Sequence, residues 1–192
     1  MNVVPSIELE NWIIEANNTY KMQGSRNGNI GISSTQNSKT LSILIPDFIT
    51  LYGIDNFKGA DDVPKLKIFS DEIEFEKFRQ FDKYLQNKKK TADTDITKSW
   101  YKNKNTTYLP LVQDRDDNRT SIIALECHDN LVIYDKERNI LYPSADKIVT
   151  PMSLVRKSCR ISCIFKMSYI YNHGGKFGVK KHLVELTILD TL

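Results

Sequence analysis

The sequence has little of what marks secreted, membrane-spanning or catalytic proteins. It contains only three cysteines and begins without a basic, apolar leader, so we expect reduced thiols and an intracellular location. No apolar run approaches the length that spans a bilayer, so we expect no membrane partner. The motifs G-x-x-x-x-G-K-S/T, G-x-S-x-G and H-E-x-x-H are all missing. We therefore expect a protein without an active site.

Candidate metal ligands are few and badly spaced. Cys159 and Cys163 would lie about 13 Å apart on one strand, at roughly 3.3 Å per residue. One zinc ion cannot bind two ligands at that separation, so we expect both cysteines to behave as small buried hydrophobic residues. Cys127 and the three histidines stand elsewhere in the chain. The sequence therefore predicts no metal and no cofactor.

One acidic cluster supports a different hypothesis. Asp114, Asp116 and Asp117 surround Arg115, and clustered carboxylates hold Mg²⁺ in nucleases. The cluster stands in a polar stretch, however, where a solvated turn is the favoured interpretation. A Mg²⁺-dependent nuclease is therefore the weakest of three hypotheses for function.

The composition is typical of a folded globular domain. The chain has 192 residues, of which 40% are hydrophobic and 27% charged, and its net charge is +3 at pH 7. We expect a single domain over residues 1–192. Within it, we expect residues 1–40 to be an N-terminal extension and residues 87–108 to be a basic flexible loop.

Two helices are expected in a chain that otherwise favours strands. A short helix is predicted over residues 6–16, where Ser6 is an N-cap candidate. A clearer helix is predicted over residues 70–86, with acidic residues in its first turn. Its apolar stripe, which we expect to dock on a sheet, consists of Ile73, Phe78, Phe81 and Leu85.

Strands are expected through most of the remaining chain, which predicts a mainly β, α+β fold. Residues 41–52 are strongly apolar, and Pro46 is expected to break them into two strands, or a strand and a turn. Turns are expected at 128–130 and 137–139, which would give a meander or small barrel. The strands around these turns are predicted at Ile122–Cys127, Leu131–Tyr134 and Ile140–Tyr142.

The clearest pattern lies near the C-terminus. Over residues 159–171 the odd positions are mostly apolar and the even positions include Arg160 and Lys166, which predicts a long strand with one buried and one polar face. The His-Gly-Gly-Lys run at 173–176 predicts a tight turn. Residues 179–189 are expected to return as a second strand, with Val184, Leu186 and Ile188 facing the core.

Basic residues gather in two segments that also carry aromatic side chains. Residues 151–184 include seven basic residues and no acidic one, and residues 87–108 include six lysines against two acids. Lysines neutralise phosphates, and aromatic rings stack on unpaired bases for about 1–3 kcal/mol each. A solvated sheet face whose aromatic rings all belong to the core is the competing interpretation.

These two segments supply the predicted nucleic-acid-binding residues. Tyr169 and Tyr171 are left out because their odd positions place them on the core side. The loop supplies Lys88, Lys89, Lys90, Trp100, Tyr101 and Lys102. The C-terminal ribbon supplies Arg156, Lys157, Arg160, Lys166, Lys176, Phe177, Lys180 and Lys181.

The C-terminal segment SCRISCIFKMSYIYNHGGKFGVKKHLVELTIL resembles the closing ribbon of the OB-fold single-stranded-DNA-binding proteins of large DNA viruses. Residues 108–111, followed by residues 122–125, look like the first barrel strands of that family. Asn172 and His173 depart from the aromatic-Asn-Gly step expected at the turn. The matching residues of the ribbon are Ile164, Ser168, Ile170, Gly175, Lys176, Phe177, Gly178, Val179 and Leu183.

The resemblance implies an OB-fold-like antiparallel β-barrel that binds a single strand across a sheet face. It implies a non-enzymatic, sequence-tolerant protein that coats single-stranded DNA, rather than RNA, during viral DNA replication or recombination. The location would be the host nucleus or a cytoplasmic viral replication site. The alternative hypothesis is a structural or scaffolding viral protein that forms a homo-oligomer through strand edges.

Overall fold

Strands dominate the structure, as the sequence predicts. The computed structural model describes residues 3–5, 20–24, 30–34, 41–56, 63–70, 75–76, 78–83, 86, 107–114, 121–173 and 175–191, the first three ranges by their backbone alone. The labelled elements are β1 (Val3–Pro5), β2 (Tyr20–Gly24), β3 (Ile30–Ser34), β4 (Leu41–Ile49), β5 (Ile54–Asp55), β6 (Lys65–Ser70), β7 (Thr107–Leu109), β8 (Gln113–Asp114), β9 (Ser121–Tyr134), β10 (Ile140–Tyr142), α4 (Pro151–Leu154), β11 (Cys159–His173) and β12 (Lys176–Thr191).

All described strands belong to one mixed sheet. Its main path runs β1-β4-β11-β12-β9-β6-β5, with the remaining strands attached beside it. β1 is parallel to β4, and β12 is parallel to both β7 and β9. Among the described strands, β1 and β5 at the two ends of the path do not pair, so the sheet is open. The mainly β, OB-like α+β class is confirmed, and the sheet differs from the predicted antiparallel barrel in being mixed and open.

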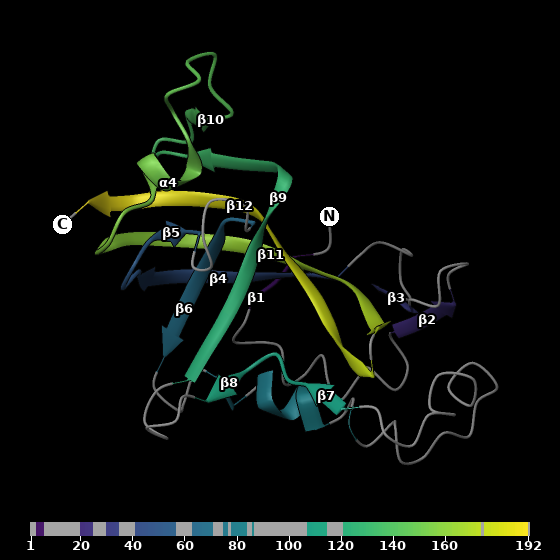
Figure 1. Cartoon of the computed structure of the whole chain (residues 1–192). Helices are drawn as coiled ribbons and strands as arrows, with labels where there is room; N and C mark the ends of the chain where they lie inside the picture. The colour runs from purple at the N-terminus through teal and green to yellow at the C-terminus, as the bar shows by residue number, and fades with distance from the viewer. Residues whose placement is uncertain are drawn as a thin grey trace.

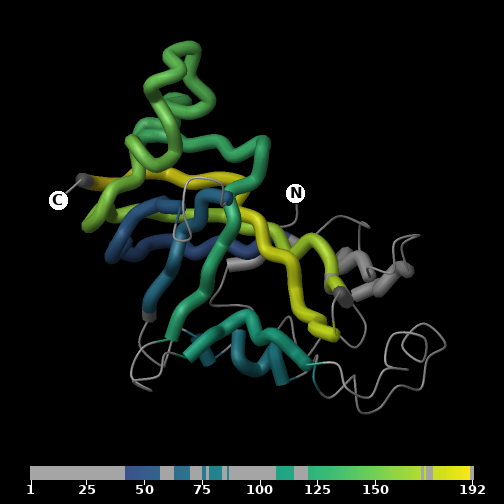
Figure 2. The backbone as a smooth tube through the Cα atoms, viewed as in Figure 1, coloured from purple at the N-terminus to yellow at the C-terminus, as the bar shows by residue number. Residues whose placement is uncertain are grey.

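The sheet curls so that its two halves enclose the core. Figure 1 shows β6 and β9 crossing in front of β4 and β11, and Figure 2 traces the same path as a tube. Alternate side chains from both halves point inward between them. The most deeply buried of these apolar side chains include Ile43, Leu66, Ile68, Ile123, Leu125, Ile161, Phe165, Leu183 and Leu186.

β11 and β12 form a long hairpin, which confirms the prediction from alternation. The odd positions from Cys159 to Met167 are at most 3% exposed. The pairing of the two strands then shifts between Met167 and Tyr169, and Tyr169 is only half-buried. Gly175 takes a φ of +73° at the turn, a conformation that favours glycine.

The returning strand follows the predicted pattern only in part. Leu186 is buried in the core and Ile188 packs against it, as predicted. Val184 is buried but lies outside the core cluster, whereas Leu183 belongs to it. The reason is a register shift against β9 between Leu183 and Glu185, which changes the phase of alternation.

β9 is one strand of 14 residues, so the predicted turn at 128–130 is wrong. Cys127 pairs with Leu183 and Val132 with Glu185, so the intervening residues of β9 bulge opposite a single residue of β12. Polar residues with local hydrogen bonds favour turns and bulges alike. Only the pairing with β12, which is distant in sequence, decides between them.

Pro46 does not break β4, which also corrects the prediction. The pairing with β11 shifts there, so that Pro46 and Asp47 stand opposite Ser162 alone. The Ser162 hydroxyl donates to the carbonyl oxygen of Ile45 at 3.2 Å. Proline has no N–H to contribute, and a bulge is one of the positions in a sheet that tolerates this.

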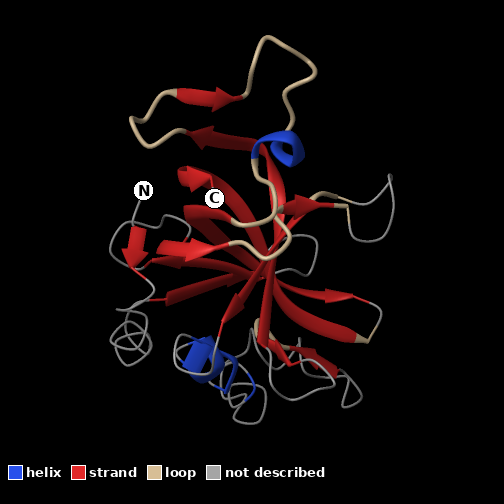
Figure 3. Cartoon of the chain, turned by 90° about the vertical axis from the view of Figure 1, so that its left-hand side faces the viewer, coloured by secondary structure: helices blue, strands red, loops and turns tan. Residues whose placement is uncertain are grey.

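A helical stretch between residues 75 and 86 covers one end of the core, within the predicted helix (Figure 3). Phe78 and Phe81 are buried, as predicted, and Phe75 joins them. The ring centroid of Phe78 lies 6.0 Å from that of Phe165. Ile73 and Leu85 lie outside the described residues. In the part of the chain that the structure describes, no helix is long and apolar enough to cross a membrane.

A small lobe projects from the other end (Figure 3). It contains the β9–β10 hairpin, whose turn at 137–139 is confirmed, and α4. Arg138 takes a φ of +68° in this turn, and the backbone N–H of Asn139 donates to the Asp135 carboxylate at 2.8 Å. The Thr150 hydroxyl accepts from the backbone N–H of Ser153 at the start of α4.

The expected N-terminal extension and basic loop are described only in part. Residues 1–40 supply β1, β2 and β3 to the sheet, and β3 pairs with β11. Thr107 and Tyr108, expected in the loop, form β7 with Leu109. The predicted helix over 6–16 and residues 87–106 lie outside the described residues.

Candidate nucleic-acid interface

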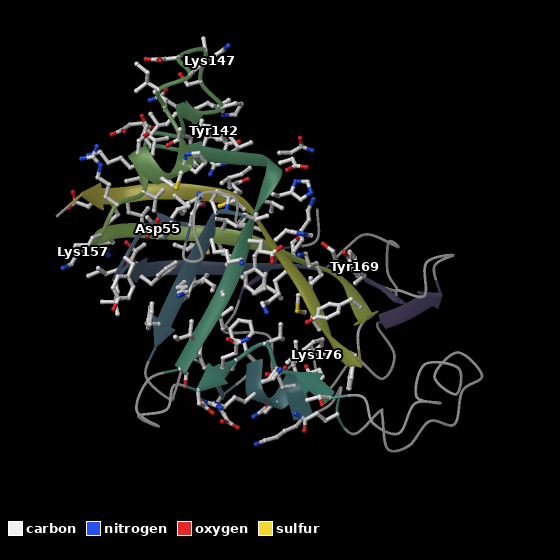
Figure 4. All side chains as sticks on the ribbon, in the orientation of Figure 1. Asp55, Tyr142, Lys147, Lys157, Tyr169 and Lys176 are labelled. Carbon is white, nitrogen blue, oxygen red and sulfur yellow. The ribbon has the colours of Figure 1, made fainter. Side chains whose placement is uncertain are left out.

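The predicted binding residues do not share one face of the hairpin. Figure 4 shows Lys157 and Lys176 at its opposite ends. Alternation predicts which residues share one side of the hairpin, but antiparallel pairing places them at different points along its length. The predicted single basic face is therefore divided into separate groups. The six predicted loop residues, which lie outside the described part of the chain, are Lys88, Lys89, Lys90, Trp100, Tyr101 and Lys102.

Three predicted residues lie at the open end of the hairpin. Arg156 and Lys157 are exposed, in a backbone that the Thr50 hydroxyl fixes by donating to the Arg156 carbonyl oxygen at 2.8 Å. Arg160 donates to Asp47 through Nε at 2.9 Å and also through Nη2. The hydrogen bond from Arg160 lowers the pKa of Asp47. Arg160 therefore carries a fixed counter-charge.

Two predicted residues lie at or next to the turn. Lys176 is exposed. Phe177 is only 1% exposed, and its ring centroid lies 4.9 Å from that of Tyr108. A ring buried in the core cannot stack on a base, so the predicted contact by Phe177 is wrong for this conformation. The bulge pattern that turns Phe177 inward is not visible in the sequence.

Lys181 is half-buried and is the cross-strand partner of the buried Met167, so it lies off the side of β12 that carries Lys180, and its contact with nucleic acid stays a prediction. Burial lowers the pKa of its ammonium group, and the negative charges of Asp82 and Glu126 act in the opposite direction. Asp82 is 5% exposed, and burial raises its pKa. The charges of Lys181 and Asp82 therefore each favour the ionised form of the other.

Lys166 and Lys180 belong to a broader surface, which we call the outer face. This is the outward side of β6, β9, β12 and β11, where Lys65 pairs with Glu126, Glu126 with His182, and His182 with Lys166. Its side chains are all half-buried. Among its described members, four lysines stand against one glutamate, and that glutamate is the ion-pair partner of Lys180. Its described members are Lys65, Lys67, Phe69, Ile122, Ala124, Glu126, His128, Lys166, Ser168, Lys180 and His182.

An aromatic pair stands at the β6 edge of the outer face. The Tyr52 and Phe69 rings are tilted at 59° with their centroids 5.4 Å apart. Tyr52 is 53% exposed, the most exposed aromatic side chain among those described. Lys67 lies two residues before Phe69 on the same side of β6. Aromatic rings beside lysines are the combination expected of a single-strand binding surface.

Sequence reasoning missed this part of the surface. The signal was present, because Lys65, Lys67 and Phe69 alternate with Leu66 and Ile68 in a period of two. No pattern in the sequence, however, places β6 beside β9 or Tyr52 beside Phe69. That neighbourhood depends on pairing between distant segments.

Asp114 has structural partners, and two of the three thiols carry pKa values raised by burial. Asp114 accepts from Arg79 and from Ser121, and the Arg79 hydrogen bond lowers its pKa. Burial raises the pKa of Cys127 to about 12 and raises that of Cys163 too. Among the described residues, no three His, Cys, Asp or Glu side chains are grouped as metal ligands.

The fold is shared with a solved structure of a phage protein. The sequence matches no protein-family model and no curated protein. The structure is similar to that of the single-stranded DNA-binding protein from bacteriophage Enc34, with a TM-score of 0.51, 10% identity and 90% of each chain covered. This likeness shows the fold.

Two further solved structures were found at lower scores. One is the Enc34 protein in complex with ssDNA, with a TM-score of 0.45, 12% identity, and 91% of this chain and 97% of that chain covered. The other is gp2.5, a single-stranded DNA-binding protein encoded by bacteriophage T7. It has a TM-score of 0.47 and 10% identity, and the match covers 76% of this chain and 87% of that chain.

Proposed function

We propose that this protein binds single-stranded DNA across the outer face, without enzymatic activity and with little sequence preference. The observation that carries the proposal is the joining of four lysines on one sheet surface, with the exposed Tyr52 and the half-buried Phe69 paired at its edge. The fold supports it, because a protein of the same fold is named as a single-stranded DNA-binding protein. Among its described residues, the surface has no pair of exposed carboxylates of the kind that acid–base catalysis uses.

Each part of the surface has a physical role in this proposal. Lys65, Lys67, Lys166 and Lys180 neutralise phosphates and release counterions, which makes binding fall as salt rises. Tyr52 and Phe69 offer ring faces to unpaired bases, which a duplex keeps stacked inside its helix. Ring stacking accepts every base, so little sequence preference is expected.

The test is a titration of labelled single-stranded oligo-dT, a DNA duplex and single-stranded RNA, followed by fluorescence anisotropy at several salt concentrations. The proposal expects oligo-dT to bind more tightly than the duplex, with affinity falling steeply as salt rises. Preference for DNA over RNA is part of the proposal, and the RNA arm tests it. No binding of oligo-dT at low salt would rule the function out.

The biological setting is also proposed rather than derived. The neighbouring folds come from phages, which fits a viral protein that coats exposed strands during DNA replication. A role in recombination, an origin in a large DNA virus and an intracellular location extend the same proposal. Each requires the source of the chain and the site where it accumulates to be determined.

A self-associating structural protein is the second candidate, and one observation favours it. The projecting lobe exposes Ile140 and Ile148, whose side chains are 62% and 82% accessible. Exposed apolar residues of this size are common in protein–protein contacts. Light scattering with and without oligo-dT separates the two functions, because a scaffold would form an oligomer of fixed size that DNA does not change.

The nuclease hypothesis rests on residues that are only partly described. Asp114 is bound to Arg79 and Ser121, and Asp116 and Asp117 lie outside the described residues. Incubation of labelled single-stranded DNA with the protein and Mg²⁺ decides the matter. Cleavage products would establish the hypothesis, and intact DNA would remove it.

A further inference from the structure

One corner of the outer face has the composition of a phosphate-binding subsite. Ser168, His182, Lys166 and His128 meet there from three different strands. We propose that this corner binds one phosphate of the single strand and that His182 takes up a proton as the phosphate binds. The inference rests on the proposed function and adds to it a defined subsite and a coupling to pH.

The geometry brings polar hydrogen-bonding groups together on one side of the sheet. The Ser168 hydroxyl lies 3.1 Å from Nδ1 of His182. The ring of His128 stands edge-on to that of His182, with centroids 5.4 Å apart and planes at 77°. Lys166 is the cross-strand partner of His182, so its ammonium group emerges on the same face. A hydroxyl, an imidazole and an ammonium group are ordinary ligands of a phosphate.

The hydrogen bonds distinguish the two histidines. The backbone N–H of Asn130 donates to Nδ1 of His128 at 3.0 Å. That nitrogen is therefore an acceptor, and neutral His128 carries its proton on Nε2. Protonating Nδ1 of His128 would break this bond. Nδ1 of His182 faces a serine hydroxyl, which accepts as readily as it donates. His182 is therefore the ring that can become an imidazolium without losing a partner.

Charges from every neighbouring strand act on His182. Lys180 on its own strand, and His128 on β9 when that ring is itself protonated, disfavour its protonated form, while Glu126 and Asp129 on β9 favour it. Glu126 is also the ion-pair partner of Lys180, and Lys65 on β6 stands opposite Glu126. On β11, Lys166 adds a further positive charge. Burial, with Lys180 and His128, lowers the pKa of His182. Burial and the neighbouring positive charges outweigh Glu126 and Asp129 in the free protein, and a phosphate would add the negative charge that favours an imidazolium.

This arrangement predicts two effects of lowering the pH: DNA affinity rises, and the stability of the free protein falls. If one proton binds with the DNA, affinity rises as pH falls, by up to about tenfold per pH unit. In the free protein the lowered pKa means that the unfolded chain binds this proton more readily. Stability of the free protein therefore falls as pH drops through the ordinary histidine value of 6.5. Bound DNA should oppose that loss.

The experiment measures oligo-dT affinity between about pH 7.5 and pH 5.5, the range in which histidine titrates. It compares the natural chain with His182→Gln, since glutamine can keep a hydrogen bond to Ser168 without taking a proton. His173→Gln is the matched control, because it replaces a histidine of the same hairpin that lies next to the turn and outside the proposed subsite. The chain has only three histidines, so their imidazole signals can be assigned by NMR and followed in the free and bound protein.

The inference expects the affinity of the natural chain and of His173→Gln to rise as pH falls, and that of His182→Gln to stay nearly constant. It also expects the pKa of His182 to rise on binding. An equal pH dependence in His182→Gln, or an unchanged pKa in the complex, would overturn the subsite and leave DNA binding in place. Failure of the natural chain to bind oligo-dT at any pH would overturn the proposed function itself.

Discussion

Asp82 is a buried carboxylate that ties the helical stretch to the segment after β7. Its Oδ1 accepts from the Tyr108 hydroxyl and from the backbone N–H of Leu111 at 2.8 Å, and its Oδ2 accepts from the N–H of Val112 at 3.2 Å. These bonds oppose the rise in pKa that burial causes. A polar residue at a buried position is therefore explained by backbone groups that need an acceptor.

Replacing Asp82 with alanine should lower the free energy of unfolding by about 2–4 kcal/mol, because two buried N–H groups would lose their acceptor. Urea denaturation followed by circular dichroism measures this change. Asp129→Ala is the matched control, since Asp129 is exposed, and a loss below about 0.5 kcal/mol is expected there. Equal effects in the two variants would show that the hydrogen bonds of Asp82 contribute little.

A substitution at Cys163 tests whether the core-facing side of β11 excludes polar groups, as its burial indicates. The side chain is 1% exposed, and burial raises the pKa of its thiol. Cys163→Ser would bury a hydroxyl in place of sulfur and should cost on the order of 1 kcal/mol or more of stability. Oligo-dT affinity measured on the folded variant should not change, because the residue faces away from the outer face. A loss of affinity in the folded variant would contradict this placement.

At the scale of elements, local pattern predicted the hairpin but not where strands bulge. The alternation of residues 159–167 was sufficient to orient β11, because one face meets the core throughout. Pro46 and the polar residues 128–130 look like breaks in the sequence, yet both lie within continuous strands. A bulge absorbs them, and its position depends on a partner strand more than 40 residues away in each case.

Two glycines with the same backbone conformation, one packed near the open end of the hairpin and one in its turn, allow the effect of packing to be separated from that of backbone conformation. Gly53 and Gly175 both take a φ of +73°. A Cβ at Gly53 would lie 2.2 Å from the carbonyl oxygen of Val155, whereas a Cβ at Gly175 meets nothing within 4 Å. The first glycine is required by close packing as well as by φ.

Gly175→Ala should therefore cost about 1–2 kcal/mol from backbone conformation alone. Gly53→Ala adds overpacking of roughly 1–3 kcal/mol to the same conformational cost. Thermal or urea unfolding of the two variants measures the difference. Equal losses would mean that the β4–β5 turn shifts away from Val155 at no cost.

At the scale of the whole molecule, the sequence predicted the class of fold better than the surface on which the basic residues of the hairpin lie. Lys166 and Lys180 share the outer face because both lie on one locally alternating hairpin, and their contact with DNA stays a prediction. Lys181 and Phe177 lie off the outer face: Phe177 packs against Tyr108 in the core, and burial lowers the pKa of the half-buried Lys181. The β6 part of the outer face could not be predicted, since it joins the hairpin only through β9.

The most direct test of the account reverses two charges on the outer face. Lys67→Glu with Lys166→Glu changes β6 and β11, at opposite sides of the surface. The matched control is Lys136→Glu with Lys147→Glu, which makes the same change of net charge on the projecting lobe, where both lysines are exposed; Figure 4 labels Lys147. The measurement is oligo-dT affinity by fluorescence anisotropy, as a function of salt, on variants shown to be folded by circular dichroism.

The account predicts that the outer-face pair loses affinity by at least about tenfold and shows a shallower dependence on salt, because two phosphate contacts are gone. The lobe pair should lose much less, by the general effect of net charge alone. Equal losses in the two variants, or a larger loss in the lobe pair, would contradict the placement of DNA on the outer face.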